Sequence, residues 1–541
     1  MKLREHFFLK LSKSGFSDKL TFKNSIRKNL KLPANKFPPD FREEADGCLC
    51  AGYFIDYGKK ISARQLLRLC KSEKWNELGS LVGDFLILFC DFDQQRLLVL
   101  TDQTGKFPCF FSMAGDSIVL STSFHNVLKE IESPSMDNNS ALDYISRNIF
   151  ITDRTVIKEI GQIPPAVLFE YRYGDSYRLN NTVDINWYER NIQTVQHSSL
   201  SDFTNAFIAS LCERVRERLV VLKDIKFAAD LTSGFDSSLV CYLLKNSTNR
   251  QFNCYSRVAS TMLEDTDPVV VNQFVKKHDL VSKLVSIENI FPFSTLSYNK
   301  WLKLDPNQTN KSELYEYLLV LKSDGNNVYF QGVGGDEVLW SNKNAVDINL
   351  RYSLQQEYFY SIWKLKYGIG KILSNKGLEI FLDKTRFQEK NIQDSLFSPS
   401  AIGVGHDSFL INWETGVWPI TPFIDPGLIG VAMGMPRSLG STPSKQEIFR
   451  MRTDIFITEQ FRQKQGAEEH VGRYLTERPK VVLSILKNSR LGEKGWIKAE
   501  EIVHDIKKGK VEEYFEGDAM SFLLNVLELE YFLQTNNIKV N

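Results

Sequence analysis

The sequence has almost no net charge and no long apolar run. Its 541 residues include 67 Lys and Arg against 66 Asp and Glu, a formal net charge of +1. No overall basic field is therefore present to attract nucleic acid. No run of about 18 apolar residues occurs, and the N-terminal MKLREHFFLKLSKSGF lacks the apolar core of a signal peptide. We expect a cytoplasmic protein that binds neither nucleic acid nor a membrane.

Cysteine and histidine are too scattered to form a metal site. The eight cysteines contain no C-x-x-C motif, and Cys48-Leu49-Cys50 is their one close pair. The seven histidines stand apart from one another and never at metal-ligand spacing. We therefore expect reduced, mostly buried thiols of the kind found in cytosolic proteins, and no zinc site.

The length predicts two or more domains. Residues 1–190 are rich in short β-like segments, with helical spacing at Phe124–Ile131 and Ala141–Ile145. The predicted strands are Leu81–Phe92, Arg96–Asp102, Phe107–Phe111, Ser117–Ser121 and Ala166–Tyr171. This order predicts an α+β layered domain, and composition alone indicates no catalytic group in it. The polar stretch Asn180–Ser201 predicts a linker to a second domain, residues 191–541.

In the second domain, predicted strands alternate with predicted helices. A helix capped near Ser201-Asp202 comes first. The strands are Phe227–Leu231, Gln251–Ser256, Ser282–Ile287 and Val328–Gln331, and the helices between them are Ser238–Lys245, Glu264–Lys277 and Ser312–Asp324. Such alternation predicts an α/β domain with a doubly wound parallel sheet, whose ligand lies at the carboxyl ends of the strands.

A small polar loop, Thr232-Ser233-Gly234-Phe235-Asp236-Ser237-Ser238, follows the first of these strands. Its Gly and Ser residues allow close backbone approach, and a helix start offers free N–H groups to an anion. Ser233 and Ser237 add hydroxyl donors. Asp236 would repel a phosphate unless a cation lay between them, which indicates a pyrophosphate cradle with one Mg²⁺ ligand. A Ser-rich helix N-cap is the alternative, and this stretch alone leaves both open.

A second glycine-rich loop, Gly332-Val333-Gly334-Gly335-Asp336-Glu337, follows the strand Val328–Gln331. Taken alone, it is also typical of a tight turn before a helix. Two loops that each deliver one aspartate, Asp236 and Asp336, suit a Mg²⁺–pyrophosphate site, because Mg²⁺ is held by one or two carboxylates plus substrate phosphates. Neither loop has the Walker pattern G-x-x-x-x-G-K-[ST].

Several N-terminal segments resemble successive motifs of the glutaminase-like domain of asparagine synthetases. These segments are Gly83-Asp84-Phe85, Thr101–Pro108, Ser121–Phe124 and Ile160–Pro165. The resemblance implies an Ntn-hydrolase-like fold. That family carries its nucleophilic cysteine directly after the initiator methionine, where the free α-amine acts as the base. Position 2 is Lys here, so we expect an inactive domain that produces no ammonia.

The loop Thr232–Ser238 resembles the S-G-G-x-D-S loop of the N-type ATP pyrophosphatases, and differs at its first two positions. Ser233 places a Cβ where that family keeps bare backbone. The resemblance implies an adenine-nucleotide α-hydrolase-like domain that uses ATP and Mg²⁺, cleaves ATP between the α- and β-phosphates, and adenylates a carboxylate. The implied nucleotide-binding residues are Leu231, Thr232, Ser233, Gly234, Asp236, Ser237, Ser238, Ser256, Gly332 and Lys445, and the implied metal ligands are Asp236 and Asp336.

Three downstream segments extend this resemblance. Pro419–Asp425 resembles the P-F-L-D segment, Lys445 with Arg450 the K-x-x-x-x-R helix, and Arg462–Gly466 the R-x-K-x-G element. The resemblance implies that Lys445 neutralises phosphate and that Lys464 stabilises the transition state, where negative charge develops. A solvated surface charge is the alternative for each lysine. Glu414 is a candidate base for the attacking amine, with a surface glutamate as the alternative.

Three nucleophiles fit such an enzyme. Ammonia is disfavoured by the missing cysteine and by Val333, where asparagine synthetases carry Glu. An internal amine that closes a β-lactam or carbapenam ring is disfavoured because the Tyr of the family's Tyr–Glu dyad would fall at Val333. The third is the N-terminal amine of a peptide, as in lasso peptide cyclases, which the chain resembles at Thr421-Pro422-Phe423, Arg450–Lys464 and Met520–Leu533.

We therefore expect an ATP-dependent isopeptide-bond synthetase. It would adenylate an Asp or Glu side chain of a precursor peptide, close a macrolactam with the peptide's N-terminal amine, and release AMP and pyrophosphate. A leader peptidase is a candidate partner. Two alternatives stay open. One is an AMP-forming ligase of the asparagine synthetase or β-lactam synthetase type that acts on a small metabolite. The other is a scaffold that catalyses nothing.

Overall fold

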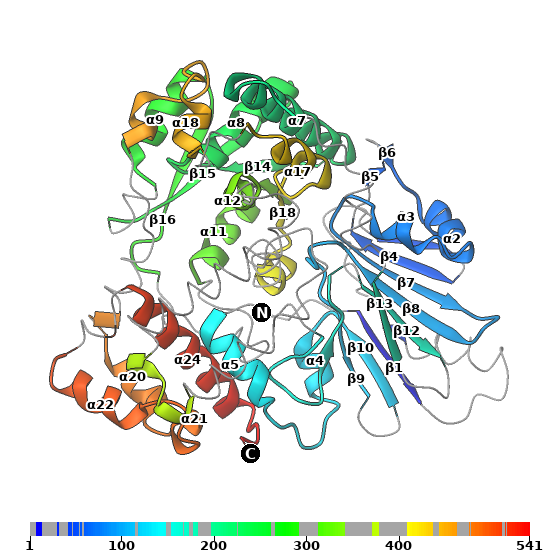
Figure 1. The fold of residues 1–541 in the computed structure, drawn as a ribbon, viewed down its shortest axis with the longest axis vertical. Coiled ribbons are helices and arrows are strands. Elements are labelled where there is room, and N and C mark those ends of the chain that lie inside the picture. Colours follow the sequence, from blue (N-terminus) through cyan, green and yellow to red (C-terminus); the bar gives the residue numbers. More distant parts are fainter. Residues whose placement is uncertain are drawn as a thin grey trace.

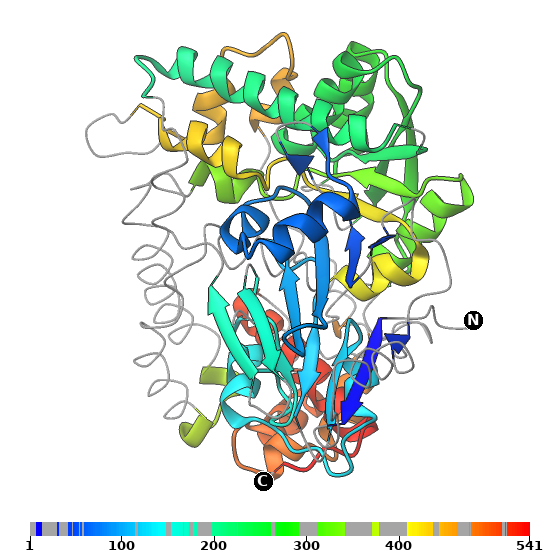
Figure 2. The same cartoon turned by 90° about the vertical axis from the view of Figure 1, so that its right-hand side faces the viewer.

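The structure is a computed structural model with three parts (Figures 1 and 2). The parallel sheet and its helices occupy one end, the C-terminal helices occupy the other, and antiparallel sheets lie to one side in Figure 1. The structure describes residues 7–12, 30–31, 42–45, 47–52, 55–56, 59–113, 117–147, 153–165, 167–172, 177–181, 196–223, 225–260, 266–290, 312–340, 370–377, 408–436, 443–462, 475–476, 478–510, 514 and 517–540.

Two antiparallel sheets form the N-terminal part. The five-stranded sheet has the order β11-β9-β10-β1-β2, and the six-stranded sheet the order β13-β12-β8-β7-β4-β3. The strands of the first are β1 (Phe8–Ser12), β2 (Leu30–Lys31), β9 (Phe110–Ser112), β10 (Ser117–Ser121) and β11 (Gly161–Gln162). Those of the second are β3 (Arg42–Ala45), β4 (Cys48–Gly52), β7 (Phe85–Asp91), β8 (Arg96–Thr101), β12 (Val167–Arg172) and β13 (Tyr177–Asn181). A hairpin joins β5 (Ile55–Asp56) to β6 (Lys59–Lys60).

Strand alternation explains how the sheets stack. Successive side chains of a strand point to opposite faces, so a strand that is apolar throughout must be covered on both sides. On β7, Leu86 and Leu88 pack into the core shared with the five-stranded sheet, whereas Ile87 packs under α2 (Ala63–Lys71) and α3 (Trp75–Gly79). On β10, Leu120 faces the shared core and Val119 faces α4 (Phe124–Leu128) and α5 (Asn138–Arg147). The predicted α+β layered domain is confirmed as helix, sheet, sheet and helix.

The second part contains a five-stranded sheet, order β16-β15-β14-β17-β18, in which every neighbouring pair is parallel. Its strands are β14 (Phe227–Asp230), β15 (Asn253–Val258), β16 (Val281–Ser286), β17 (Val328–Phe330) and β18 (Trp418–Ile420). Helices α7 (Leu200–Val221), α8 (Phe235–Ser247) and α9 (Pro268–Lys277) pack with one face, and α11 (Ser312–Ser323) and the helical residues 408–415 with the other. The predicted α/β domain with a parallel sheet is confirmed.

Strand order identifies where a ligand would bind. From β14 the chain moves outward to β15 and β16, then crosses back to place β17 and β18 on the other side of β14. Parallel sheets bind ligands outside the carboxyl ends of the strands at such a point of reversal. Here that point lies between β14 and β17, the two strands that lead into the glycine-rich loops.

The C-terminal helices complete the N-terminal part rather than the parallel sheet. In Figure 1, α24 (Gly517–Thr535) runs beside α5, and Asn525 Nδ2 donates to the Ile145 carbonyl over 3.1 Å. The other helices of the second half are α12 (Gly335–Trp340), α14 (Gly370–Ile372), α17 (Pro426–Met433), α18 (Lys445–Phe449), the 3₁₀ helix η4 (Thr458–Arg462), α20 (Lys480–Leu486), α21 (Arg490–Glu493) and α22 (Ala499–Lys507).

Buried polar contacts join the antiparallel and parallel parts. Asp84 Oδ2 accepts from Lys106 Nζ at 3.1 Å and from Trp418 Nε1 at 2.9 Å, and Lys106 Nζ also donates to Thr421 Oγ1 at 2.6 Å. The Phe107 ring stacks on Trp418 with 4.8 Å between ring centroids. The segments Gly83–Phe85 and Thr101–Pro108 therefore hold the two parts together.

Three predicted helix starts differ from the structure, each because of local capping. Helix α8 begins at Phe235 rather than Ser238, with Gly234 as its N-cap. Helix α9 begins at Pro268 rather than Glu264, because Asp267 caps it and Pro suits a first helical position. Helix α7 begins at Leu200, and its cap is Ser199, whose hydroxyl accepts from the Asp202 N–H. The expected linker lies largely outside the described residues.

The expected burial of most thiols is confirmed, since seven of the eight cysteines are buried and Cys212 is partly exposed. Cys48 and Cys50 lie within β4. Among the described helices, none has the length and apolar content needed to cross a membrane.

Candidate functional site

The two glycine-rich loops pack against each other at the carboxyl ends of β14 and β17. A Cβ on Gly332 would lie 2.7 Å from the Asp236 carbonyl carbon and 2.9 Å from the Asp236 Cβ. A Cβ on Gly335 would lie 2.7 Å from Asp236 Oδ2. Any side chain at either position would displace the first loop. Gly334 adopts φ +96°, a conformation that favours glycine.

Two carboxylates, one from each loop, meet a single buried ammonium group. Lys445 Nζ forms an ion pair with Asp236 and another, of 2.5 Å, with Asp336. The Lys445 side chain is 9% exposed, whereas that of Asp336 is 56% exposed. Burial alone would lower the pKa of Lys445, but the two aspartates outweigh it and raise that pKa. The cluster therefore combines a permanent positive charge with carboxylate oxygens open to solvent. Because its side chain is buried, Lys445 is not the solvated surface charge that was the alternative from sequence.

The first loop is held by its own side chains. The Ser237 hydroxyl accepts from the Thr232 N–H at 3.0 Å and lies 2.9 Å from Thr232 Oγ1. Thr232 Oγ1 in turn accepts from the Gly234 N–H at 3.1 Å. Ser233 is 1% exposed, and its hydroxyl accepts from the Asp267 N–H at 2.7 Å. The Ser233 side chain thus joins the loop to the start of α9, and the extra Cβ fits inside the fold.

A buried glutamine connects the loop to η4. Gln460 is 3% exposed, and its Nε2 donates to the Ser233 carbonyl at 3.2 Å and to Ser238 Oγ at 2.8 Å. Its Oε1 accepts from the Ile457 N–H at 3.0 Å. Next to it, the Phe235 ring contacts the rings of Phe456 and Phe461, with 5.0 and 5.1 Å between centroids. The segment 455–461 is therefore fixed to the start of α8.

A second buried cluster lies at the carboxyl end of β14. The Tyr317 hydroxyl donates to Asp230 Oδ1 at 2.9 Å, and the Arg257 guanidinium lies 5.4 Å from the Tyr317 ring centroid. Burial and the neighbouring Asp230 raise the pKa of Tyr317 well above its usual value. This tyrosine stays protonated and acts as a hydrogen-bond donor that fixes the Asp230 carboxylate.

The other predicted site residues are Leu231, Ser256, Glu414 and Lys464. Leu231 is fully buried and its N–H donates to the Tyr255 carbonyl at 2.8 Å. Ser256, on β15, is also fully buried, and its hydroxyl has no hydrogen-bond partner among the described residues. Glu414 is 2% exposed in the helical residues 408–415, so its alternative as a surface glutamate is wrong. Lys464 lies outside the described residues.

Sequence reasoning missed Gln460 and Asp267. Gln460 follows Thr458 and Glu459 in a polar stretch, so no local pattern in the sequence marks it as buried. Asp267 precedes Pro268, a typical helix start, and this local signal was available in the sequence.

The comparisons with known proteins add little to this geometry. No protein-family profile matches the chain, and the search of curated proteins gives no match. One similar solved structure is an allosteric regulatory enzyme of purine biosynthesis, with 9% identity and a TM-score of 0.21 over 54% of this chain and 76% of that chain. Another is the glutamine phosphoribosylpyrophosphate amidotransferase from B. subtilis complexed with ADP and GMP, with 10% identity and a TM-score of 0.20 over 54% and 77%. At such TM-scores the likeness carries no argument.

The residues at this site fit a divalent cation bound together with phosphates. Two carboxylates converge on one cationic group, which is the charge arrangement that a Mg²⁺ ion would also satisfy. The described residues contain no cluster of three or more His, Cys, Asp or Glu that could enclose a metal. A cation here would depend on ligand phosphates for the rest of its coordination, which is usual for Mg²⁺.

Proposed function

We propose that this chain is an ATP-dependent, AMP-forming carbon–nitrogen ligase. The observation that carries the proposal is the meeting of Asp236, Asp336 and Lys445 between two glycine-rich loops, at the reversal point of a parallel sheet. Carboxylates, an ammonium group and closely packed backbone together suit a nucleotide's phosphates and their cation. The resemblance of Thr232–Ser238 to the loop of the N-type ATP pyrophosphatases supports cleavage between the α- and β-phosphates.

In this proposal Asp236 and Asp336 would hold Mg²⁺, which would neutralise phosphate charge. Lys445 moves from the two carboxylates to the departing pyrophosphate, where its positive charge is needed. The first-turn N–H groups of α8 would donate to the phosphate oxygens, and Gly332 and Gly335 leave the space in which both loops approach. Leu231 and Ser256 line the adenosine end, and Lys464 stabilises the negative charge of the transition state.

For the acceptor, we propose the N-terminal amine of a precursor peptide, which attacks the adenylated Asp or Glu side chain of the same peptide. A precursor peptide of this kind is the substrate of lasso peptide cyclases, and C-terminal segments of this chain resemble segments of those enzymes. The proposed base is Glu414, which is buried in the helical residues 408–415. A leader peptidase is the proposed partner.

The test is ATP–pyrophosphate exchange with short peptides that carry a free N-terminus and one internal Asp or Glu. We expect exchange that requires both Mg²⁺ and the peptide, and a product peptide lighter by one water as determined by mass spectrometry. Blocking the peptide's N-terminus should preserve the exchange and abolish the lighter product. Release of ADP instead of AMP would overturn the proposal.

One observation favours a non-catalytic scaffold as the second candidate. The hydroxyls of Thr232, Ser233 and Ser237 are all hydrogen-bonded within the protein. A loop whose hydroxyl groups are already hydrogen-bonded inside the protein gains less free energy from binding a phosphate. A scaffold would bind peptide but neither nucleotide nor pyrophosphate, so the exchange assay separates the two candidates. A ligase of a small metabolite would show exchange with that metabolite and not with peptides.

A further inference from the structure

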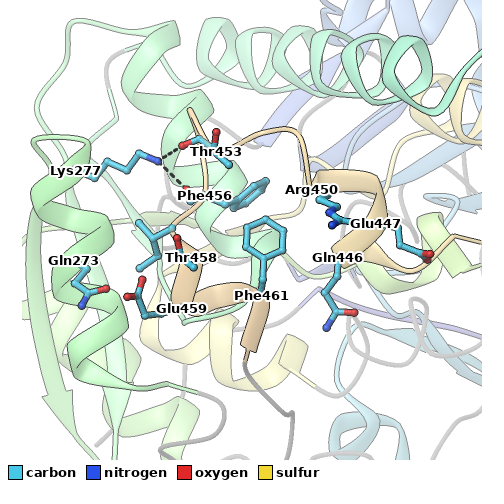
Figure 3. A pocket seen from close by; sticks show the side chains of 11 residues that line it. Gln273, Lys277, Gln446, Glu447, Arg450, Thr453, Phe456, Thr458, Glu459 and Phe461 are labelled. Carbon is cyan, nitrogen blue, oxygen red and sulfur yellow. Dashed lines mark hydrogen bonds between the residues drawn. The ribbon is translucent and has the colours of Figure 1, made fainter.

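A groove of about 670 Å³ lies beside the proposed nucleotide site, between α9 and α18 (Figure 3). Gln273 and Lys277 of α9 line one wall, and Gln446, Glu447 and Arg450 line the other. The floor is the segment 453–461, which supplies Phe456, Ile457 and Phe461. We call this the α9–α18 groove. It lies within the usual size range of ligand sites, about 300–1,000 Å³.

The groove is rigidly connected to the proposed site. Helix α18 begins at Lys445, which touches both aspartates, and its C-cap is Arg450 in the groove wall. The same Phe456 and Phe461 rings contact Phe235, the first residue of the helix that carries Asp236. Lys277 fixes the floor, because its Nζ donates to the carbonyls of Thr453 and Phe456 (Figure 3). An occupant of the groove would thus lie at a fixed distance from the reacting groups.

The groove also carries charges of both signs that are available for a ligand. Arg450 is exposed and interacts electrostatically with the exposed Glu447 of the same wall, and Glu459 is partly exposed; neither Arg450 nor Glu459 forms an ion pair with another described residue. Between them lies the apolar floor of Phe456, Ile457 and Phe461. A ligand that satisfies all three features has an apolar group between an acidic and a basic one. An extended peptide has this character, and a nucleotide or a sugar does not.

Distances along the chain fit a peptide that spans both sites. Lys445 and Arg450 are five residues apart, which corresponds to about 7.5 Å along a helix. An extended peptide rises about 3.3 Å per residue, so two or three residues would cover that distance. A peptide anchored in the groove would place a side chain two or three positions away beside Lys445.

We propose that the α9–α18 groove binds a segment of the peptide substrate. The segment carries an aromatic or aliphatic side chain on the floor, an acidic side chain beside Arg450, and a basic side chain beside Glu459. This proposal rests on the proposed function, because it specifies how that function's peptide is held. It predicts that the sequence around the adenylated residue, and not the reacting groups alone, determines which peptides are accepted.

The test is calorimetric titration of the full chain with acetyl-Glu-Phe-Gly-Lys-amide, without ATP. We expect saturable binding, weakened about tenfold when the peptide's Phe is replaced by Ala, because most of a buried aromatic side chain's transfer free energy is lost. Thr458→Trp should fill the groove and weaken binding by at least about tenfold. Val269→Trp is the matched control, since Val269 lies on α9, is 62% exposed and is outside the groove lining.

A charge exchange keeps the proposal testable if Thr458→Trp fails to fold. Glu459→Lys should weaken binding of the same peptide and restore it for acetyl-Glu-Phe-Gly-Glu-amide. No saturable binding, or equal binding by wild type and Thr458→Trp, would overturn the proposal. Binding of α,β-methylene-ATP, measured on the same variants, reports on the nucleotide site independently. If the wild type does not bind α,β-methylene-ATP, the proposed function is overturned. Peptide binding by the groove would then stand as a separate result.

Discussion

Two aspartates in this molecule illustrate two uses of charge inside a fold. Asp102, in the antiparallel part, is fully buried and accepts from the N–H groups of Phe85, Thr104, Lys106 and Phe107 and from the Thr104 hydroxyl. Asp236, in the parallel part, meets the ammonium group of Lys445, which it shares with the half-exposed Asp336.

The difference lies in what surrounds each carboxylate. The donors around Asp102 are mostly backbone groups of one loop, so this residue fixes the path of residues 102–107. Around Asp236 the structure instead has glycines, at positions where any side chain would collide with Asp236. Asp102 therefore stabilises the fold, whereas the proposed function assigns Asp236 to a site that accepts a charged ligand. Each of the following predictions sharpens this contrast or removes it.

The largest expected effect comes from Asp236→Asn. Loss of this charge should reduce ATP–pyrophosphate exchange by about a hundredfold or more, because the cation loses a protein ligand. The melting temperature should change little, since Lys445 keeps Asp336. Asp102→Asn is the matched control. It should lower the free energy of unfolding by about 1.5–3 kcal/mol and leave exchange per folded molecule unchanged. Equal effects of both substitutions on exchange would remove the contrast.

Gly335→Ala should have the next largest effect. The new methyl group would displace the Asp236 carboxylate, so exchange should fall about tenfold to a hundredfold, together with a destabilisation of about 1–3 kcal/mol. Gly377→Ala provides the control, because its methyl group would collide with the Trp496 carbonyl, outside the site. That variant should lose stability alone. Unchanged exchange in Gly335→Ala would show that the loops need not approach so closely.

Gln460→Ala tests whether the buried glutamine positions the first loop. The Ser233 carbonyl and the Ile457 N–H would lose their partner, at a cost of about 1–3 kcal/mol. We expect the apparent KM for ATP to rise several-fold while kcat changes less, because the residue acts through the loop and not on the reacting atoms. A fall in stability with an unchanged KM would limit Gln460 to a role in folding.

The smallest effect concerns pH. Burial lowers the pKa of His278 below its usual value of 6.5. The unfolded chain therefore binds this proton more readily than the folded chain, and stability is lost as the pH falls below that value. Thermal melting between about pH 7.5 and 5.5 should show a decline of a few degrees that His278→Gln removes. His278 Nε2 contacts the Ile455 carbonyl at 2.6 Å, so the loss should affect the floor of the α9–α18 groove. A decline that persists in His278→Gln would assign it to other groups.

The sequence predicted those features that depend on local pattern. Strand β10 has the predicted bounds, Ser117–Ser121, because a short apolar run between polar residues marks it in the sequence. The two glycine-rich loops were predicted to meet because carboxyl ends of parallel strands share one edge of a sheet. The sequence alone did not show whether Lys445 lies between these loops or on the surface. It is more than a hundred residues beyond Asp336, and no local pattern shows which charges meet.

Features set by packing between distant segments could not be predicted. The burial of Glu414 follows from the helix 408–415 lying between the parallel sheet and the N-terminal part, which no periodicity reveals. The packing of α24 on α5 joins segments almost four hundred residues apart, as in the 3.3 Å hydrogen bond from the Tyr144 hydroxyl to Glu528. The bonds of Gln460 to Ser233 and Ser238 are of the same kind.

The central claim is that the cluster of Asp236, Asp336 and Lys445 binds a nucleotide together with Mg²⁺. Its most direct test is calorimetric titration with α,β-methylene-ATP, which cannot be cleaved between the α- and β-phosphates and requires no knowledge of the acceptor. We predict one site that requires Mg²⁺, is lost in Asp236→Asn and is retained in Asp102→Asn. Absence of binding in the wild type, or equal binding by wild type and Asp236→Asn, would contradict the claim.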